Sequence, residues 1–181
     1  MTEKSQRMKW TIKAGNILDE SADVLVVSAN VGLNLSGGVS GDLLARYGPD
    51  MQRALHDYLY DHKLQFVQQG EVIPYSGEGI PHKAVLHAVS VDGFYQSNPA
   101  RVQQVVRVAL QMAAEKYQAK KVLLTALATG YGNLTLADFG ETLRPLVSEN
   151  FAPVEEVCIC LKGEDRMHEL AQAFPEATVV G

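Results

Sequence analysis

Two runs of apolar, largely β-branched residues each lead into a glycine-bearing loop, and this repeated arrangement most constrains the fold. The first run, Val24–Asn30 (VLVVSAN), leads into Val31–Asp42 (VGLNLSGGVSGD), and the second, Val122–Ala128 (VLLTALA), leads into Thr129–Asn133 (TGYGN). Near-continuous apolar runs are typical of parallel strands covered on both faces. A glycine loop between strand and helix brings backbone N–H groups and the positive end of the helix dipole close to an anion. The two runs therefore predict phosphate-binding loops, although plain turn chemistry explains the glycines equally well.

Strand-like and helix-like segments alternate along most of the chain. The residue patterns predict strands over Lys9–Lys13 (an edge strand), Asp23–Ala29, Gln69–Ile73 (closed by Pro74), Ala84–Val91, Lys121–Ala128 and Glu156–Leu161. They predict helices over Asp42–Tyr47, Pro49–Lys63, Pro99–Tyr117, Leu136–Asn150 (interrupted at Pro145) and Gly163–Phe174. This alternation favours an α/β fold with helices on both faces of a largely parallel sheet. The two glycine loops can share a ligand only if their strands are parallel neighbours, because ligands lie beyond the carboxyl ends of such strands.

The size and charge of the chain limit the classes of function. Its 181 residues fit one domain, expected over residues 9–181 after a flexible tail at residues 1–8. A net charge of −5, from 16 basic and 21 acidic residues, argues against charge-driven nucleic-acid binding. No run of 18 apolar residues indicates a membrane span, and the polar start MTEKSQRMKW is not a secretory signal. Cys158 and Cys160 fall on one face of a strand and are expected to be reduced core thiols, which suits a cytoplasmic protein.

Familiar catalytic and cofactor motifs do not fit the glycine loops. No lysine follows the glycines as a P-loop requires, and the glycine spacing differs from that of a dinucleotide-binding fingerprint. Ser40 lacks the glycine two residues before it that a nucleophile elbow needs. The five histidines show no metal-ligand spacing, so neither a metal nor a cofactor is expected.

A few polar residues elsewhere allow more than one interpretation. His87 lies inside an apolar strand and is expected to be a core histidine with its hydrogen bonds satisfied rather than a catalytic base. Asp42 is expected to be an acid in the first turn of a helix, where it suits the dipole. Glu71 either orients a neighbouring loop or is a surface carboxylate. The turn Asp92–Tyr95 (DGFY) either caps the end of a site or packs as an ordinary loop.

Six short segments occur in an order that matches a known family. They are KAGNI at 13–17, VVSAN at 26–30, SGGVSG at 36–41, GEV at 70–72, IPHKAVLHAV at 80–89 and ALATGYG at 126–132. Over residues 10–170 the chain thus resembles the macrodomain family, whose members bind ADP-ribose. The resemblance implies a three-layer α/β/α sandwich with a mixed, largely parallel central sheet. It also implies that the partner is ADP-ribose or an ADP-ribosylated protein.

The resemblance assigns roles to residues on both sides of the ligand. Asn16 stands where the family has an aspartate that accepts a hydrogen bond from the adenine amino group, and Ile17 would offer its backbone N–H to the purine edge. Asn30 would bind the distal ribose and would be the catalytic residue if the protein is an enzyme. The ring of Tyr131 would cover the distal ribose or pack on its own loop. The diphosphate would be held by the two loops, through Gly37, Gly38, Val39 and Ser40 on one side and Thr129, Gly130, Tyr131 and Gly132 on the other.

Two departures from the family pattern bear on activity. Ser40 occupies the position at which the hydrolase branch has an aspartate, and a serine hydroxyl is not a general base near neutral pH. Leu161 or Lys162 stands where an aromatic ring often covers the adenine. The first hypothesis is therefore a module that binds ADP-ribose or ADP-ribosylated proteins. The second is an ADP-ribosyl hydrolase that acts on modified acidic side chains, O-acetyl-ADP-ribose or the 1″-phosphate, with water activated by the phosphate of the substrate. The third is a scaffold that has lost its ligand.

Overall fold

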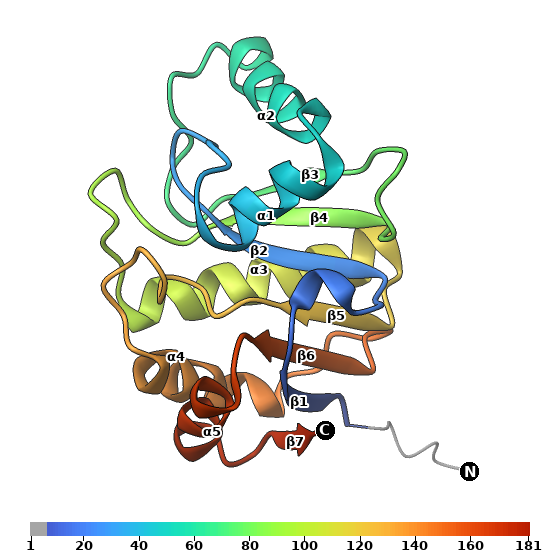
Figure 1. Ribbon diagram of the computed structural model, residues 1–181, viewed down its shortest axis with the longest axis vertical. Coiled ribbons are helices and arrows are strands. Elements are labelled where there is room, and N and C mark those ends of the chain that lie inside the picture. Colours follow the sequence, from blue (N-terminus) through green and yellow to red (C-terminus); the bar gives the residue numbers. More distant parts are fainter. Residues whose placement is uncertain (1–6) are drawn as a thin grey trace.

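The computed structural model describes residues 7–181, and within this range seven strands form one mixed sheet (Figure 1). The strands are β1 (Lys9–Ala14), β2 (Val24–Ala29), β3 (Val72–Tyr75), β4 (Ala84–Val89), β5 (Lys121–Leu124), β6 (Glu156–Leu161) and β7 (Thr178–Val180). Their order across the sheet is β3-β4-β2-β5-β6-β1-β7. The edge strand β3 is antiparallel to β4, and the other paired strands are parallel. The expectation of a mixed, largely parallel sheet is thus confirmed.

Helices cover both faces of the sheet. The helices are α1 (Gly38–Tyr47), α2 (Asp50–Asp61), α3 (Pro99–Tyr117), α4 (Leu136–Leu143) and α5 (Glu164–Ala173), with 3-10 turns η1 (Ile17–Asp19) and η2 (Arg144–Ser148). The last three helices pack on one face in an apolar cluster that includes Val26 and Leu124, and α1, α2 and η1 pack on the other face against Leu25 and Leu123. Alternate residues of β2 and β5 thus enter opposite cores, as the strand period requires. The three-layer α/β/α arrangement is confirmed. Within residues 7–181 no helix is long and apolar enough to cross a membrane.

The strand edges differ from the prediction at two places. Strand β1 was expected at an edge, but it lies between β6 and β7. The edge is formed by β7. This strand has only three residues and is largely exposed, so it shows no pattern of alternating apolar residues in the sequence. At the opposite edge, β3 runs through Pro74 instead of ending before it, because an edge strand can spare the backbone N–H that proline lacks. A flexible tail was expected at residues 1–8, of which residues 1–6 lie outside the described residues. Met8 is not part of a loose tail, because its side chain is buried in the core.

The two strands that carry the glycine loops are parallel neighbours. Strand β2 pairs with β5 in parallel, with Val24 beside Val122 and Val26 beside Leu124. Their carboxyl ends therefore lie at the same edge of the sheet, and both loops leave from that edge. The geometric condition for a shared ligand is met.

Candidate functional site

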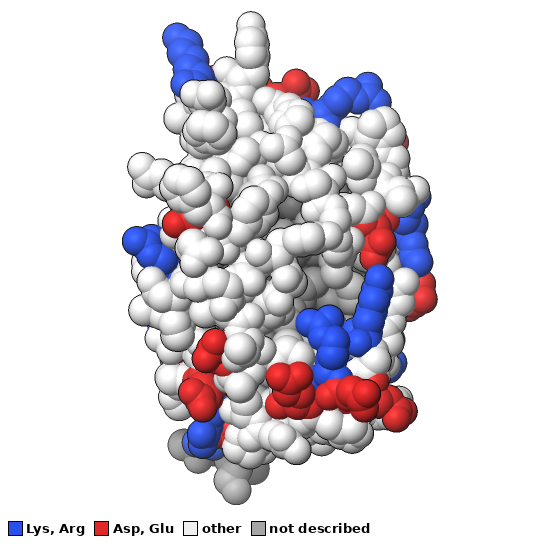
Figure 2. All heavy atoms as spheres, turned by 60° about the vertical axis from the view of Figure 1, so that its left-hand side comes forward, with Lys and Arg blue, Asp and Glu red and all other residues white. Residues whose placement is uncertain are grey.

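A cleft of about 220 Å³ opens at the carboxyl ends of the central strands. Both glycine loops line it, together with residues that follow β1 and β6. In Figure 2 this face of the molecule is hollowed and largely uncharged, with basic side chains toward one end of the hollow. The lining residues are Gly15, Ile17, Ser28, Ala29, Asn30, Asn34, Ser36, Gly37, Gly38, Val39, Ser40, Val91, Tyr95, Thr125, Ala126, Ala128, Thr129, Gly130, Tyr131, Gly132, Cys160, Leu161, Lys162 and Arg166.

The first loop ends directly in helix α1, which begins at Gly38 rather than at the predicted Asp42. Glycine has low helix propensity, so the sequence favoured a longer loop, but Gly37 and Gly38 use positive φ angles of 65° and 53° to turn the chain into the helix. The Gly41 N–H donates to the Gly37 carbonyl at 2.9 Å. Within residues 7–181 the N–H groups of Gly38, Val39 and Ser40 have no acceptor, so the first turn of α1 offers them to the cleft.

The second loop leaves β5 and folds tightly on itself. A Cβ on Gly132 would overlap the backbone of Ala128, and the Leu134 N–H donates to the Ala128 carbonyl at 3.1 Å. The Thr129 hydroxyl donates to the Ala126 carbonyl at 2.7 Å. No acceptor in the described part of the chain receives the N–H groups of Thr129, Gly130, Tyr131 or Gly132. A second set of free donors therefore lines the cleft across from α1.

The two loops touch each other through Tyr131. Its side chain is 70% exposed, but a Cβ added to Gly37 would overlap its ring. The ring therefore lies across the first loop. The sequence left two possibilities for this ring, namely that it covers a ribose or that it packs on a loop. In this structure Tyr131 packs on the loop opposite its own.

Asn30 lines the cleft and at the same time fixes the loop after β2. Its amide nitrogen donates to the Asn34 carbonyl at 3.0 Å, and its amide oxygen accepts from the Asn34 N–H at 3.1 Å. Gln52 of α2 holds the same segment from behind, because it accepts from the Leu35 N–H at 2.6 Å and donates to the Leu33 carbonyl at 2.9 Å. Asn34 also lines the cleft, but the sequence analysis did not identify it as a site residue. Its only distinguishing feature in the sequence is its position in a polar loop.

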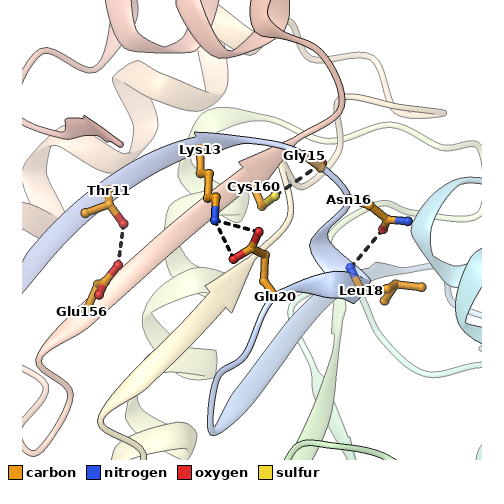
Figure 3. Close-up of polar contacts among 8 residues, drawn as sticks. All are labelled: Thr11, Lys13, Gly15, Asn16, Leu18, Glu20, Glu156 and Cys160. Carbon is orange, nitrogen blue, oxygen red and sulfur yellow. Dashed lines mark hydrogen bonds and ion pairs between the residues drawn. The ribbon is translucent and has the colours of Figure 1, made fainter. Parts of the chain in front are cut away.

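Asn16 lies between two residues that line the cleft. Gly15 and Ile17 line the cleft, whereas Asn16 does not. Its side-chain oxygen accepts from the Leu18 N–H at 3.0 Å and so caps η1, as Figure 3 shows. The Ile17 N–H donates to no group within residues 7–181 and remains available to a ligand.

Basic residues lie at the end of the cleft formed by β6 and α5. Lys162 and Arg166 are the charged residues of the lining, and Lys162 also pairs with Asp42 at 2.9 Å. Asp42 was predicted in the first turn of a helix, but the earlier start of α1 moves it beyond that turn and into this ion pair. Arg166 was missed in the sequence. The sequence feature that could have identified Arg166 is its position in the first turn of the helix that follows the last long strand.

Cys160 lies beside this basic end of the cleft as a buried thiol. Its thiol donates to the Gly15 carbonyl at 3.4 Å, and Cys158 and Cys160 are both free and buried, which confirms the prediction of core thiols. Burial raises the pKa of Cys160 to about 11, so the group is a thiol and not a thiolate near neutral pH.

No carboxylate or imidazole lines the cleft among the described residues. Ser40 stands at the position where the resemblance would place an aspartate in a hydrolase. Its hydroxyl donates to the Ser28 carbonyl at 3.2 Å. Within residues 7–181 no three His, Cys, Asp or Glu side chains gather as a metal site would need. The lining can therefore hold an anion through N–H groups, and among the described residues it offers no carboxylate or imidazole as a general base.

Other polar residues singled out in the sequence lie outside the cleft. His87 is fully buried, and the prediction that its hydrogen bonds are satisfied is wrong, because neither ring nitrogen has a partner within residues 7–181. Burial lowers the pKa of His87 to about 4. Glu71 accepts from the Gln68 N–H at 2.6 Å, which fits the interpretation that it orients a neighbouring loop. Asp92 accepts from the Phe94 N–H at 2.8 Å and so fixes a turn that brings Tyr95 to the cleft.

Comparisons with known proteins agree with this geometry. The Macro domain family model matches residues 26–142. A macro domain-containing protein of Streptomyces griseus is 29% identical over 145 residues, which cover 79% of this chain and 81% of that protein. The human protein mono-ADP-ribosyltransferase PARP14 is 27% identical over 172 residues, which cover 92% of this chain but 9% of PARP14.

Solved structures share the fold at low sequence identity. A mutant Oceanobacillus iheyensis macrodomain with ADPR has a TM-score of 0.79 and 20% identity, covering 90% of this chain and 89% of that one. A Trypanosoma brucei macrodomain in complex with ADP-ribose has a TM-score of 0.72 and 22% identity, covering 89% of this chain and 67% of that one.

Proposed function

The chain belongs to the macrodomain family, and from this premise we propose that it binds ADP-ribose, free or attached to a protein. One observation carries the proposal. Two sets of backbone N–H groups without acceptors in the described residues, at Gly38–Ser40 and at Thr129–Gly132, line one cleft from opposite sides. Such donors fit two linked phosphates, and the dipole of α1 adds partial positive charge on one side. The diphosphate is held between the loops, with Gly37 and Gly38 allowing the close approach.

The two ends of the cleft differ in chemistry and orient the ligand. One end is formed by Gly15, Ile17, Cys160–Lys162 and Arg166. It combines apolar side chains with donors and takes the purine, and we name it the base end. The other end carries Asn30, Asn34 and Tyr95 and takes the distal ribose. In this assignment Ile17 donates its N–H to the base and Asn30 contacts the ribose.

Related proteins support this ligand without deciding it. The Oceanobacillus iheyensis neighbour is described with ADPR and the Trypanosoma brucei neighbour with ADP-ribose. PARP14 is a mono-ADP-ribosyltransferase, and this chain matches only a small part of its length. An ADP-ribosylated protein is therefore the macromolecular partner that we propose.

The lining favours binding over hydrolysis. No carboxylate or imidazole lines the described cleft, and the Ser40 hydroxyl donates to the Ser28 carbonyl, so the side chains that most often activate water are absent from the lining. Hydrolysis would depend on the phosphate of the substrate to do so. We therefore propose a binding module rather than an enzyme.

Gly130 offers a sharp test, because a Cβ at this position meets open space and the backbone needs no positive φ. Gly130→Glu adds a carboxylate beside the free N–H groups, and Gly130→Gln adds the same bulk without charge. Titration calorimetry with ADP-ribose should show binding by the wild type, weaker binding by Gly130→Gln and loss of binding by Gly130→Glu. Folded wild-type protein that gives no heat at millimolar ADP-ribose would overturn the proposal and favour the scaffold function.

A further inference from the structure

We infer that a rim of exposed aromatic side chains at the ribose end of the cleft binds the polypeptide that carries the ADP-ribose. This ribose rim consists of Phe66, Phe94, Tyr95 and Tyr131. It favours a partner with apolar side chains beside the modified residue. The inference deepens the proposed function and rests on it, because it assumes that the cleft holds ADP-ribose.

Exposed aromatic side chains are concentrated around the cleft. Among the described residues, the exposed aromatic side chains are those of Tyr60, Phe66, Phe94, Tyr95 and Tyr131. Tyr95 and Tyr131 line the cleft, and of the other three only Tyr60 belongs to a helix, α2. Single exposed apolar side chains are common on proteins, whereas a group of them beside a cleft is typical of a binding surface.

Phe66 and Phe94 lie next to residues that contact Val31, in the loop after β2. The Val67 N–H donates to the Val31 carbonyl at 2.9 Å, and a Cβ added to Gly93 would lie 3.9 Å from a methyl carbon of Val31. Figure 1 shows the segments that follow α2 and β4 on the side of the molecule where the parallel strands end. Both aromatic residues therefore border the loop that forms the ribose end of the cleft.

The turn that carries Phe94 is tied to the wall of the cleft. The Asp92 carboxylate accepts from the N–H groups of Phe94 at 2.8 Å and Gln96 at 3.0 Å. Asn133, in the second glycine loop, accepts from the Ser97 N–H at 2.7 Å and donates to the Ser97 carbonyl at 3.2 Å. These bonds fix the position of the Phe94 backbone relative to the cleft. An aromatic side chain on a fixed turn loses little conformational freedom when a partner binds.

The segments around the ribose rim are uncharged. Residues 30–41, 64–70, 93–100 and 126–137 contain no Lys, Arg, Asp or Glu, although such residues make up 20% of the chain. Asp92 precedes one of these segments, and its carboxylate accepts from N–H groups of its own turn. Figure 2 shows the hollowed face as largely uncharged, with basic side chains toward one end. An uncharged aromatic surface gains free energy by burying apolar groups and offers no opposite charge to an ionised side chain.

The chemistry of the ligand identifies what passes over this rim. An ADP-ribose on a protein is linked through the anomeric carbon of its distal ribose, and the proposed ribose end is formed by Asn30, Asn34 and Tyr95. The modified polypeptide therefore leaves the cleft at this end and passes the ribose rim. Apolar side chains on each side of the modified residue can then pack on the aromatic rings.

Phe94→Ala tests the rim without changing the lining of the cleft, which does not include Phe94. Tyr60→Ala is its matched control. The two side chains are 85% and 83% exposed, so neither substitution leaves a cavity, and Tyr60 does not line the cleft either. Circular dichroism of each variant establishes that it is folded.

The experiment uses free ADP-ribose and three synthetic peptides, each mono-ADP-ribosylated on a central serine. The residues on both sides of the serine are leucine, glycine or lysine. Titration calorimetry of the wild type should show roughly tenfold tighter binding of the leucine peptide than of the glycine peptide, because the leucine side chains are buried on the rim. Phe94→Ala should lose most of this preference and keep its affinity for free ADP-ribose. Tyr60→Ala should behave as the wild type does.

The possible failures are distinguishable. If the wild type binds the leucine and glycine peptides equally, or binds the lysine peptide most tightly, the inference is overturned and the proposed function stands. A leucine preference that Phe94→Ala keeps in full would also overturn it. Sedimentation tests another occupant, because a dimer of the free protein that Phe94→Ala abolishes would make the rim an interface between copies and overturn the inference. If the folded wild type binds none of the four ligands, the proposed function fails and the inference fails with it.

Discussion

The ring of Tyr131 lies over Gly37, so the second glycine loop closes on the first across the mouth of the cleft. The contact leaves no room for a side chain at position 37, where the backbone also has a positive φ of 65°. Two separate reasons therefore require glycine here. One is the conformation of its own backbone, and the other is the space taken by the tyrosine.

Gly37→Ala should destabilise the protein through both effects. Gly37 combines a φ of 65° with a ψ of 166°, a region that is almost confined to glycine and costs an alanine about 1 to 3 kcal/mol, and displacement of the Tyr131 ring adds to this cost. Urea unfolding of Gly37→Ala, Tyr131→Ala and the double variant separates the two contributions. The cost of Gly37→Ala should be smaller in the Tyr131→Ala background, because only the backbone strain remains. Equal costs in both backgrounds would contradict the contact.

Gln52 should influence ligand binding although it does not line the cleft. It fixes the Leu33–Leu35 segment through the Leu35 N–H and the Leu33 carbonyl, and this segment includes Asn34, which Asn30 holds from the cleft side. We expect Gln52→Ala to weaken ADP-ribose binding roughly five- to tenfold by loosening the loop, since an intramolecular hydrogen bond contributes about 1 kcal/mol.

Gln103→Ala is the control for this prediction. Gln103 also donates its amide to a carbonyl, that of Thr142 at 3.1 Å, but it lies on α3 away from the glycine loops. It should lose a similar amount of stability without a change in affinity. The idea fails if calorimetry shows the same affinity for Gln52→Ala and the wild type.

The protein should retain ADP-ribose rather than release it from a modified protein. No described carboxylate or imidazole lines the cleft, and Asn30 is bonded at both ends of its amide to Asn34. Incubation with a mono-ADP-ribosylated protein should therefore release label equally slowly with the wild type and with Asn30→Ala. Rapid release by the wild type that Asn30→Ala abolishes would establish a hydrolase instead.

Elements with strong internal patterns could be predicted to the residue. The helix Pro99–Tyr117 and the strand Glu156–Leu161 have the predicted bounds, because a regular apolar stripe and a buried β-branched run leave few alternatives. The start of α1 was misplaced because glycines at 37, 38 and 41 favour a loop locally, and packing in the fold overrides that preference.

The arrangement within the site depended on contacts that no local pattern encodes. The segments on each side of the cleft were identified, and all the residues predicted to bind the ligand except Asn16 line it. The hydrogen bond from Leu18 to Asn16 and the contact of Tyr131 with Gly37 follow from side-chain directions that exist only in the folded chain. The same is true of Arg166, which reaches the cleft because β6 ends and α5 begins beside it.

His87 should make stability depend on pH below neutrality. Burial lowers its pKa from the ordinary value of 6.5 to about 4, so the folded protein holds the ring neutral while the unfolded chain takes up a proton at higher pH. The contribution to stability is complete above pH 6.5 and is lost as the pH falls toward 4, by about 3 kcal/mol in total. Because neither ring nitrogen has a partner within residues 7–181, His87→Leu should fold and should remove this dependence. Urea unfolding between pH 4.5 and 7.5 measures the slope, and an equal slope in the wild type and in His87→Leu would show that other groups titrate in this range.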